Sequence, residues 1–595
     1  MACMAEHCTQ AAAVRLTGLR PRSILDAMNA SKRTRSALVG LCLAVAAPPS
    51  GCGSPHAVAP MSSKPAVGTL LVVNARLWTA DPNRPAAEAM AVRDGLIVAV
   101  GTRTDAERAC PGAEILDCGG RRVTPGLIDS HLHLVSGGAS LSRLAMRDLA
   151  DRRAFVDAVA ARAREVRRGG WLLGRGWSTD SWADPSTPTR DWIDPITGDV
   201  PALLYRMDGH GALANTAALR LAGIDRSDVK DPPGGTIERD ATGRPTGILK
   251  ESAIERVAAL VPPAGLEEQA ADTIAAMREA NRFGVTAVAT MSEWADLAAL
   301  QRVHADGRDT LRVAVYVMES DWAAFVDRVR SMPVRDDRLW IAGFKAFMDG
   351  SLGSRTAYMR EPFADRPETR GLLSDTMLAP GRMRANLDAA DAAGFQSAIH
   401  AIGDEANHLL LNLYADLAAR RAPRDRRQRI EHAQHLLPDD VPRFARQGVI
   451  ASMQPLHKAD DGRYAELAIG PQRARSSYAF RDLLASGATL AFGSDWPVVT
   501  LNPMAGVHAA VTGRTLNGRT WMTHQNLTVE EALSAYTRGA AFAMHREHRI
   551  GRLAPGMLAD FTVFETDPLS IRPDDLAGVR VASTYIGGRR VWPLD

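Results

Sequence analysis

Short apolar runs alternate with alanine-rich amphipathic stretches through the middle of the chain, a pattern typical of parallel β-strands joined by helices. Eight such runs are candidate strands, and eight strands with intervening helices form a (β/α)8 barrel of the TIM type. The candidate strands are 126–134, 286–291, 312–318, 341–347, 397–402, 429–434, 449–455 and 490–497. We therefore predict an α/β fold with this barrel at its centre.

The spacing of the strands predicts what is added to the barrel. The interval between the first two strands is far too long for a loop, so we expect a large insertion, a lid domain at 141–280, after the first strand. β-branched runs broken by turn residues fill 67–124 and return at 549–595. They predict a small β-sandwich-like domain built from both chain ends, with the barrel and its insert spanning 125–548.

The first 66 residues have the composition of a leader. Basic residues precede an apolar run at 37–47, which is too short for the roughly 20 residues that cross a bilayer. We expect Met28 to be the true start and a lipoprotein-type cleavage before Cys52, which would anchor the protein by a lipid. The expected location is the cell envelope, whether secreted, periplasmic or lipid-anchored. A disordered tail on a cytoplasmic protein is the alternative.

Composition narrows the class of partner. The chain has 71 basic and 68 acidic side chains, a net charge of +3, and no long basic run, so we expect a small-molecule substrate and no nucleic acid. Six cysteines without a C-x-x-C pair favour neither a disulfide framework nor a thiolate zinc site. A homodimer is possible, and the sequence does not decide the oligomeric state.

Polar residues cluster where the predicted strands end. In "GLIDSHLHL" (126–134) two histidines lie two residues apart, so they share one face of a strand about 6.6 Å apart. Side chains at the carboxyl ends of barrel strands meet at one mouth, where catalysis takes place. The candidates selected by this rule are His131, His133, Lys345, His400, His432 and Asp495. Imidazole and carboxylate donors suit zinc and similar divalent ions.

Each candidate also has a structural interpretation. A single strand-end histidine is often only a hydrogen-bonded core residue. Lys345 could form an ordinary salt bridge, but its apolar neighbours in "AGFKAF" favour a shifted pKa or a modified lysine. Asp495 in "AFGSDWP" could cap the turn after its strand.

Taken together, the motifs resemble those of the amidohydrolase superfamily, in particular amidohydrolase family 3, which includes N-substituted formamide deformylase-like metal-dependent hydrolases. The resemblance runs from about residue 68 to the C-terminus. Its motifs are "TPGLIDSHLHL", "GRGWSTDSW", "MDGHGALANTAAL", "PTGILKE", "FKAFMDGSLGSRTA", "HAIGD", "IEHAQ", "ASMQPLH", "GSDWPV" and "GRLAPGMLADFTVF".

The resemblance implies a two-metal site. His131 and His133 would bind one zinc ion with Asp495, His400 and His432 would bind a second, and carboxylated Lys345 would bridge them. Two ions roughly 3.5–4 Å apart can share a hydroxide that attacks an amide-type carbonyl. Asp495 would act first as general base and then as general acid.

Three further residues are candidate substrate contacts: His210, Arg355 and His457. We expect a hydrolase of amide-type C–N bonds in N-formyl, N-acyl or cyclic amide small molecules. An esterase, lactonase or deaminase of the same fold is the first alternative, because the fold does not choose the leaving group. A non-catalytic binding or scaffold protein on the same barrel is the second.

Overall fold

The computed structural model describes residues 68–594 apart from short gaps, and residues 65–595 make up one compact unit. The gaps are 147–148, 168, 180–181, 185, 207–210, 233–234, 319–321, 331–335 and 380. The predicted leader, with Met28 and Cys52, and the candidate His210 therefore lie outside the described residues. Among the described residues, no helix is both long and apolar enough to span a membrane.

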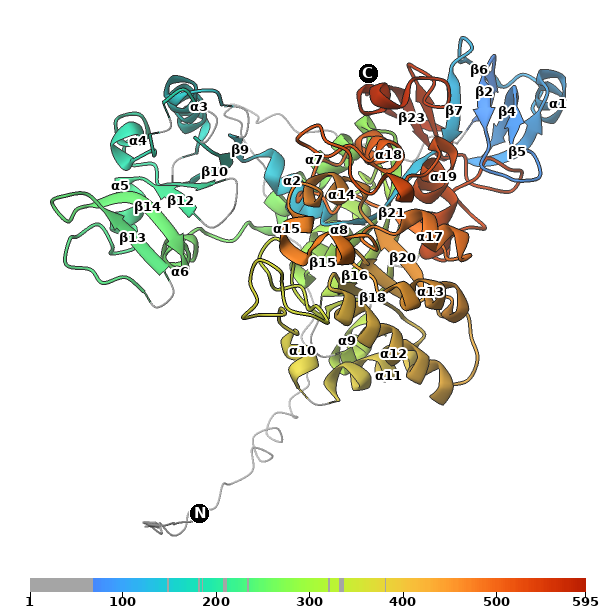
Figure 1. Cartoon of the computed structure of the whole chain (residues 1–595). Coiled ribbons are helices and arrows are strands. Elements are labelled where there is room, and N and C mark those ends of the chain that lie inside the picture. Colours follow the sequence, from blue (N-terminus) through green and yellow to red (C-terminus); the bar gives the residue numbers. More distant parts are fainter. Residues whose placement is uncertain are drawn as a thin grey trace, which may run out of the picture. The chain divides into compact units, whose positions relative to one another are not determined.

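Eight parallel strands form the central sheet, and each neighbours the next in chain order (Figure 1). They are β8 (Leu127–Leu132), β15 (Val285–Ser292), β16 (Arg312–Met318), β17 (Leu339–Phe347), β18 (Gln396–Ala401), β19 (Arg429–His432), β20 (Ile450–Met453) and β21 (Leu490–Phe492). All eight predicted strands are confirmed. The first and last strands meet through two backbone hydrogen bonds, from Asp495 N to His131 O at 2.7 Å and from His133 N to Trp496 O at 2.8 Å.

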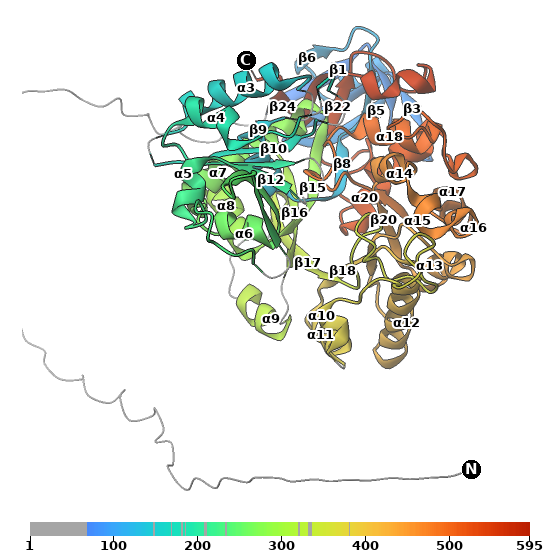
Figure 2. The same cartoon turned by 60° about the vertical axis from the view of Figure 1, so that its left-hand side comes forward.

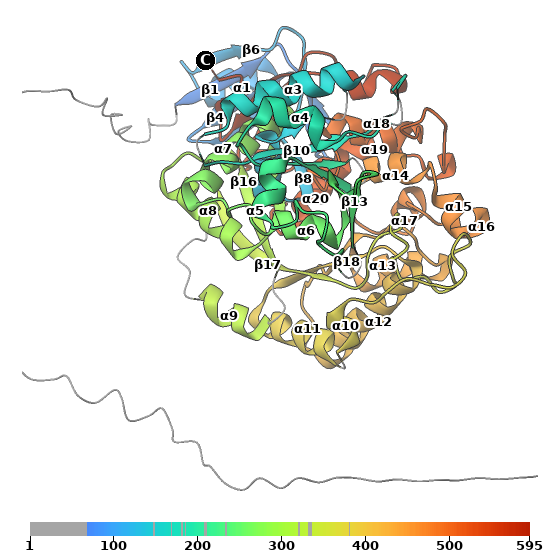
Figure 3. The same cartoon turned by 90° about the vertical axis from the view of Figure 1, so that its left-hand side faces the viewer.

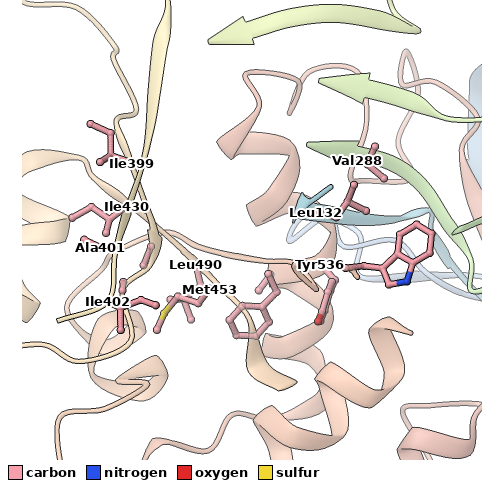
Figure 4. Close-up of a cluster of buried hydrophobic side chains, with 14 of the residues drawn as sticks. Leu132, Val288, Ile399, Ala401, Ile402, Ile430, Met453, Leu490 and Tyr536 are labelled. Carbon is pink, nitrogen blue, oxygen red and sulfur yellow. The ribbon is translucent and has the colours of Figure 1, made fainter. Parts of the chain in front are cut away.

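Both faces of these strands are buried, which is why their sequences are nearly continuously apolar. In β15, Ala287 and Ala289 belong to the cluster that fills the barrel interior, whereas Val288 belongs to the cluster between strands and helices. Val288, Ile399 and Ile430 are members of this outer cluster (Figure 4). Small side chains inside leave room for polar residues in the barrel.

Helices cover the outside of the barrel. The helices that connect its strands include α7 (Leu266–Arg282), α8 (Trp294–Ala305), α9 (Trp322–Arg330), α11 (Arg382–Ala393), α12 (Asp404–Arg420), α13 (Val441–Gln447) and α17 (Phe480–Ala485), and α18 (Pro503–Thr512) follows the last strand. Helices α11 and α12 lie side by side and both contact β18 (Figures 2 and 3). Helix α7 contacts β15 and α2 (Leu134–Leu141).

A second sheet lies in the sequence between β8 and β15. Its strands, in spatial order, are β13 (Gly235–Arg239), β14 (Pro245–Glu251), β12 (Gly211–Ala214), β11 (Ala202–Arg206), β10 (Leu172–Trp177) and β9 (Leu144–Ala145). Its accompanying helices are α3 (Arg152–Glu165), α4 (Arg190–Thr197), α5 (Thr216–Leu221) and α6 (Ser252–Ala258). Leu204 packs with Phe155 on one face, and Leu203 packs with Leu219 on the other. That this segment acts as a lid stays a prediction.

Strands from the two ends of the chain pair with each other. Strand β22 (Phe561–Phe564) lies between β7 (Arg122–Pro125) and β23 (Val581–Ile586), and the sheet continues to β24 (Arg589–Trp592) on one side and to β2 (Arg76–Trp78) and β3 (Ala86–Ala87) on the other. A four-stranded sheet holds β5 (Leu96–Gly101), β4 (Ala89–Arg93), β1 (Thr69–Val73) and β6 (Glu114–Asp117). Val92 and Phe561 share one apolar cluster, which joins the two sheets.

Candidate metal centre

A cavity of about 350 Å³ lies at the carboxyl ends of the barrel strands, and all six predicted strand-end residues line it. They come from five strands or the loops directly after them, as the parallel barrel dictates. His457, from α14 (Pro455–Asp461) after β20, also lines the cavity. Residues up to 364 positions apart therefore converge on one small volume.

The first half of the site is formed by His131, His133 and Asp495. The Nε2 atoms of His131 and His133 lie 3.5 and 3.3 Å from Oδ1 of Asp495. The three side chains bring one donor atom each to within 4.8 Å of one another. His131 is fully buried, and its Nδ1 atom hydrogen-bonds Glu431 at 2.5 Å, so Nε2 is the nitrogen that faces the cavity.

His400 and His432 form the opposite side, with ring centroids 4.5 Å apart. Nδ1 of His432 contacts the side-chain oxygen of Gln454 at 2.7 Å, and Nε2 of His400 contacts the carbonyl oxygen of Gly350 at 3.0 Å. In each ring one nitrogen is thus occupied and the other is left for a ligand. A second donor group within 4.8 Å consists of His432, His457 and Asp495, so His457 lies closer to the donor set than the sequence suggests.

Two site residues have a left-handed backbone. The φ angles of His432 and Asp495 are +74° and +58°, a region that non-glycine residues rarely adopt and that costs about 1–3 kcal/mol each. His432 ends β19 and Asp495 lies three residues after β21, and both side chains line the cavity. Such cost is typical of residues held in place for function.

Lys345 is buried among these imidazoles. Its Nζ atom lies 3.4 Å from Nε2 of His131 and 5.1 Å from the centroid of the Phe347 ring. Burial lowers the pKa of Lys345 to about 8, although Glu431 and Asp495 oppose the shift. The neutral, nucleophilic amine is therefore easier to reach near neutral pH than for an exposed lysine.

Burial and neighbouring groups shift the pKa values of the carboxyl and imidazole groups in the site. Burial alone would raise the pKa of Asp495, but the hydrogen bond from His133 and the charges of His131 and His432 hold it well below the ordinary value. Burial and the nearby charge of Lys345 lower the pKa of His131 to about 4, although Glu431 and Asp495 oppose the shift. These shifts favour an ionised Asp495 and a neutral His131, the forms that can ligate a metal ion.

The donor chemistry fits a divalent metal ion. Neutral imidazole nitrogens and a carboxylate oxygen are the ligands of zinc sites, and here such donor atoms lie within 4.8 Å of one another. Nε2 of His457 is buried and lacks a hydrogen-bond partner among the described residues, so a ligand in the cavity would satisfy it.

The other two candidate substrate contacts are Arg355 and His210. Arg355 does not line the cavity; its guanidinium group contacts Asp365 at 2.5 and 3.0 Å and the carbonyl oxygen of Leu352 at 2.9 Å. His210 lies outside the described residues. A substrate role for either stays a prediction.

Sequence reasoning missed Glu431, which lies in the "IEHAQ" motif directly before His432. Arg429 and Glu431 lie two residues apart in the short strand β19, so their side chains share one face, where each buried charge needs a partner. That opposite-charge pair in a buried strand was the signal that could have identified it.

Comparisons with known proteins identify similar sequences and folds. A model of the amidohydrolase family matches residues 114–592. The protein LONG AFTER FAR-RED 3 of Arabidopsis thaliana is 36% identical over 543 residues, which cover 89% of this chain and 92% of the plant protein. N-substituted formamide deformylase of Arthrobacter pascens is 27% identical over 541 residues, covering 87% and 97%. The crystal structure of an uncharacterized metal-dependent hydrolase from Pyrococcus horikoshii OT3 superposes with a TM-score of 0.70 at 28% identity, covering 85% of this chain and 99% of the other.

Proposed function

The chain belongs to the amidohydrolase family of metal-dependent hydrolases, and from this premise we propose that it hydrolyses an amide-type C–N bond of a small molecule, with Asp495 transferring the proton. The observation that carries the proposal is the convergence of Asp495, four histidines and Lys345 on one cavity. A scaffold protein would have no use for this arrangement, because buried polar clusters are costly unless they bind something.

Metal ions would be held by the cavity histidines and Asp495, and zinc is the ion that this donor set suits best. When bound, such an ion polarises a carbonyl group and lowers the pKa of water. We propose two ions, bridged by Lys345 once carbon dioxide has carboxylated it. The support is that Lys345 is buried beside His131 and lines the same cavity as His400 and His432, where an ammonium cannot ligate but a carbamate can. Intact-mass measurement under native conditions would detect the added carbon dioxide.

Asp495 is placed to move the proton. Because its pKa is held low, it is ionised at neutral pH and can accept a proton from the attacking water molecule. The water oxygen forms a bond to the carbonyl carbon. As the C–N bond breaks, Asp495 returns the proton to the leaving nitrogen, so that an acid and an amine are released and the carboxylate is regenerated.

The remaining cavity wall is mixed, with Asp460 and Asp461 beside apolar side chains. Phe347, Leu352 and Val498 line it, and polar contacts are available from Gln434 and Tyr464. A volume of about 350 Å³ lies near the lower end of the range for small-molecule sites, so we propose a compact substrate.

A substrate panel tests the function. Metal-loaded enzyme is offered N-formyl amines, N-acyl amines and cyclic amides beside matched esters, lactones and aminopyrimidine-type deaminase substrates, with release of amine, alcohol or ammonia as readout. We expect cleavage of at least one amide class. Turnover confined to esters and lactones, or to ammonia release, would contradict the proposal and favour the alternative of the same fold.

A further inference from the structure

His131 differs from His400 and His432 in the group that contacts the ring nitrogen not available to a metal ion. Its nearest partner is a carboxylate, Glu431, at 2.5 Å, and both side chains are 0% exposed. The nearest partner of His432 is the neutral amide oxygen of Gln454, and that of His400 is the carbonyl oxygen of Gly350. A buried carboxylate, Asp349, also lies 3.5 Å from Nε2 of His400, but its oxygens accept from three backbone N–H groups at 2.8–3.0 Å. The two sides of the site are therefore supported unequally, because only His131 has a carboxylate as its nearest partner.

Arg429 fixes the position and charge of Glu431. Its Nε and Nη2 atoms contact the two carboxylate oxygens at 2.7 and 3.1 Å, and Nη2 also donates to Ser130 O at 2.5 Å and to Ser452 Oγ at 2.9 Å. The guanidinium group lies 4.7 Å from the ring centroid of Tyr316. Glu431 is consequently held as an ionised, oriented acceptor in the barrel interior.

Stability alone does not account for this arrangement. A buried ion pair costs desolvation and is often no better than an apolar pair of similar volume. In addition, Nη1 of Arg429 is buried without a partner among the described residues, which adds to the cost. The contact that depends on the ion pair is the one to His131.

We propose that Glu431 is a positioning residue for metal binding: it holds the Nδ1 proton of His131, so that the Nε2 lone pair faces Asp495, 3.5 Å away, and it thereby sets the affinity of this half of the site for its divalent ion. The inference rests on the metal-dependent function proposed above. A carboxylate behind an imidazole fixes the tautomer and raises its basicity, and its loss typically weakens metal binding about 10–100-fold.

Zinc affinity measured by competition with a chromogenic chelator tests the inference. Glu431→Gln keeps the shape but removes the charge, and we expect zinc binding to weaken by about 10–100-fold. Glu547→Gln is the matched control, because Glu547 also pairs with an arginine, Arg427, at 2.7 and 2.8 Å but contacts no cavity residue. Its zinc affinity should equal that of the wild type. An equal affinity in folded Glu431→Gln would overturn the inference.

Leaving Arg429 unpaired could unfold Glu431→Gln, so a second variant is needed. Arg429→Met with Glu431→Gln removes both charges and restores a neutral interior. We expect this double variant, shown to be folded by its circular dichroism, to retain the weak zinc binding. Recovery of wild-type affinity would show that Glu431 only balances Arg429. The visible spectrum of the cobalt-loaded protein gives an independent readout, expected to change in the Glu431 variants and not in Glu547→Gln.

The outcomes separate this inference from the proposed function. Wild-type protein that binds zinc tightly, loses it in Glu431→Gln, and cleaves no amide supports the positioning role and contradicts the proposed reaction. Amide cleavage by the wild type, together with unaltered zinc binding in Glu431→Gln, supports the proposed reaction and contradicts the positioning role. Wild-type protein that binds no divalent ion contradicts both.

Discussion

At the scale of single residues, the proposed reaction assigns two roles to Asp495, the residue that contacts both His131 and His133. Its backbone is left-handed, and its carboxylate lines the cavity in the loop after β21. The two proposed roles are metal ligation and proton transfer, and a substitution that keeps one side-chain oxygen separates them.

Asp495→Asn retains an oxygen donor but cannot accept the proton. We expect kcat to fall by about 10²–10⁴-fold, with the metal content largely kept. Steady-state kinetics and elemental analysis on the same preparation measure both quantities. Asp416→Asn, on the outer side of α12 where Asp416 pairs with Arg384, serves as the control and should keep its kcat. Undiminished turnover in Asp495→Asn would remove this residue from the mechanism.

A second residue, His435, gives the protein a pH dependence that is separate from the donor set. His435 is buried, contacts Ser477 through Nδ1 at 2.7 Å, and its pKa is lowered to about 3 by burial and by Arg473. Below pH 6.5 the unfolded chain takes up a proton that the folded chain does not, so stability falls as pH falls towards 3, by up to about 1.4 kcal/mol per pH unit.

Denaturant unfolding in the presence of a chelator between pH 6 and 4 checks this dependence. His435→Asn should lose stability on acidification less steeply than the wild type, because one titrating group has been removed. Parallel curves for the two proteins would show that His435 does not contribute.

The sequence predicted the strand-end residues well, because their positions follow from strand periodicity and from the barrel rule. Glu431 was missed for a physical reason: its role depends on which side chains meet inside the barrel, here His131 from β8, 300 residues away. The pairing of Arg355 with Asp365 was likewise not readable, since it depends on how the loop after β17 folds.

At the scale of elements, strand β17 carries Lys345 and must approach β18 closely. Gly343 pairs with Gln396, and a Cβ atom added at Gly343 would lie 1.9 Å from the Gln396 carbonyl oxygen. The strands can therefore keep their register only if residue 343 has no side chain.

Gly343→Ala should force β17 and β18 apart. We expect a loss of about 1–3 kcal/mol or more in the free energy of unfolding, and lower activity because Lys345 is two residues away. Thermal unfolding with Gly578→Ala as control checks this, since an added Cβ there meets no atom within 4 Å. A midpoint equal to the wild type in Gly343→Ala would contradict the packing described.

All eight strands of the barrel were predicted to within a few residues, because buried parallel strands are short apolar runs bounded by turn residues. Sequence pattern could not supply the register between strands or the closure of the sheet through Asp495 and Trp496. Those features come from tertiary contacts.

At the scale of the whole molecule, one buried ion pair joins the barrel to the C-terminal segment. Arg312 in β16 contacts Asp560, just before β22, at 2.5 and 2.9 Å, and Asp560 also accepts from Gly587 N at 2.8 Å. Both side chains are less than 5% exposed, so neither charge has water as an alternative partner.

Asp560→Ala should destabilise the folded chain by about 3–5 kcal/mol, because Arg312 is left buried and unpaired. The exposed pair between Arg514 and Asp574 provides the comparison, and Asp574→Ala should cost at most about 1 kcal/mol. Denaturant midpoints measure the difference. Equal midpoints for the two variants would show that the C-terminal segment is held mainly by its apolar contacts.

The central claim is that the strand-end cluster holds divalent metal that the reaction needs. Elemental analysis and amide hydrolysis are measured on one preparation as purified, after chelation and after addition of zinc. The account predicts about two ions per chain, loss of both ions and activity on chelation, and the return of both with zinc. A folded, metal-free protein that cleaves amides at an undiminished rate would contradict it.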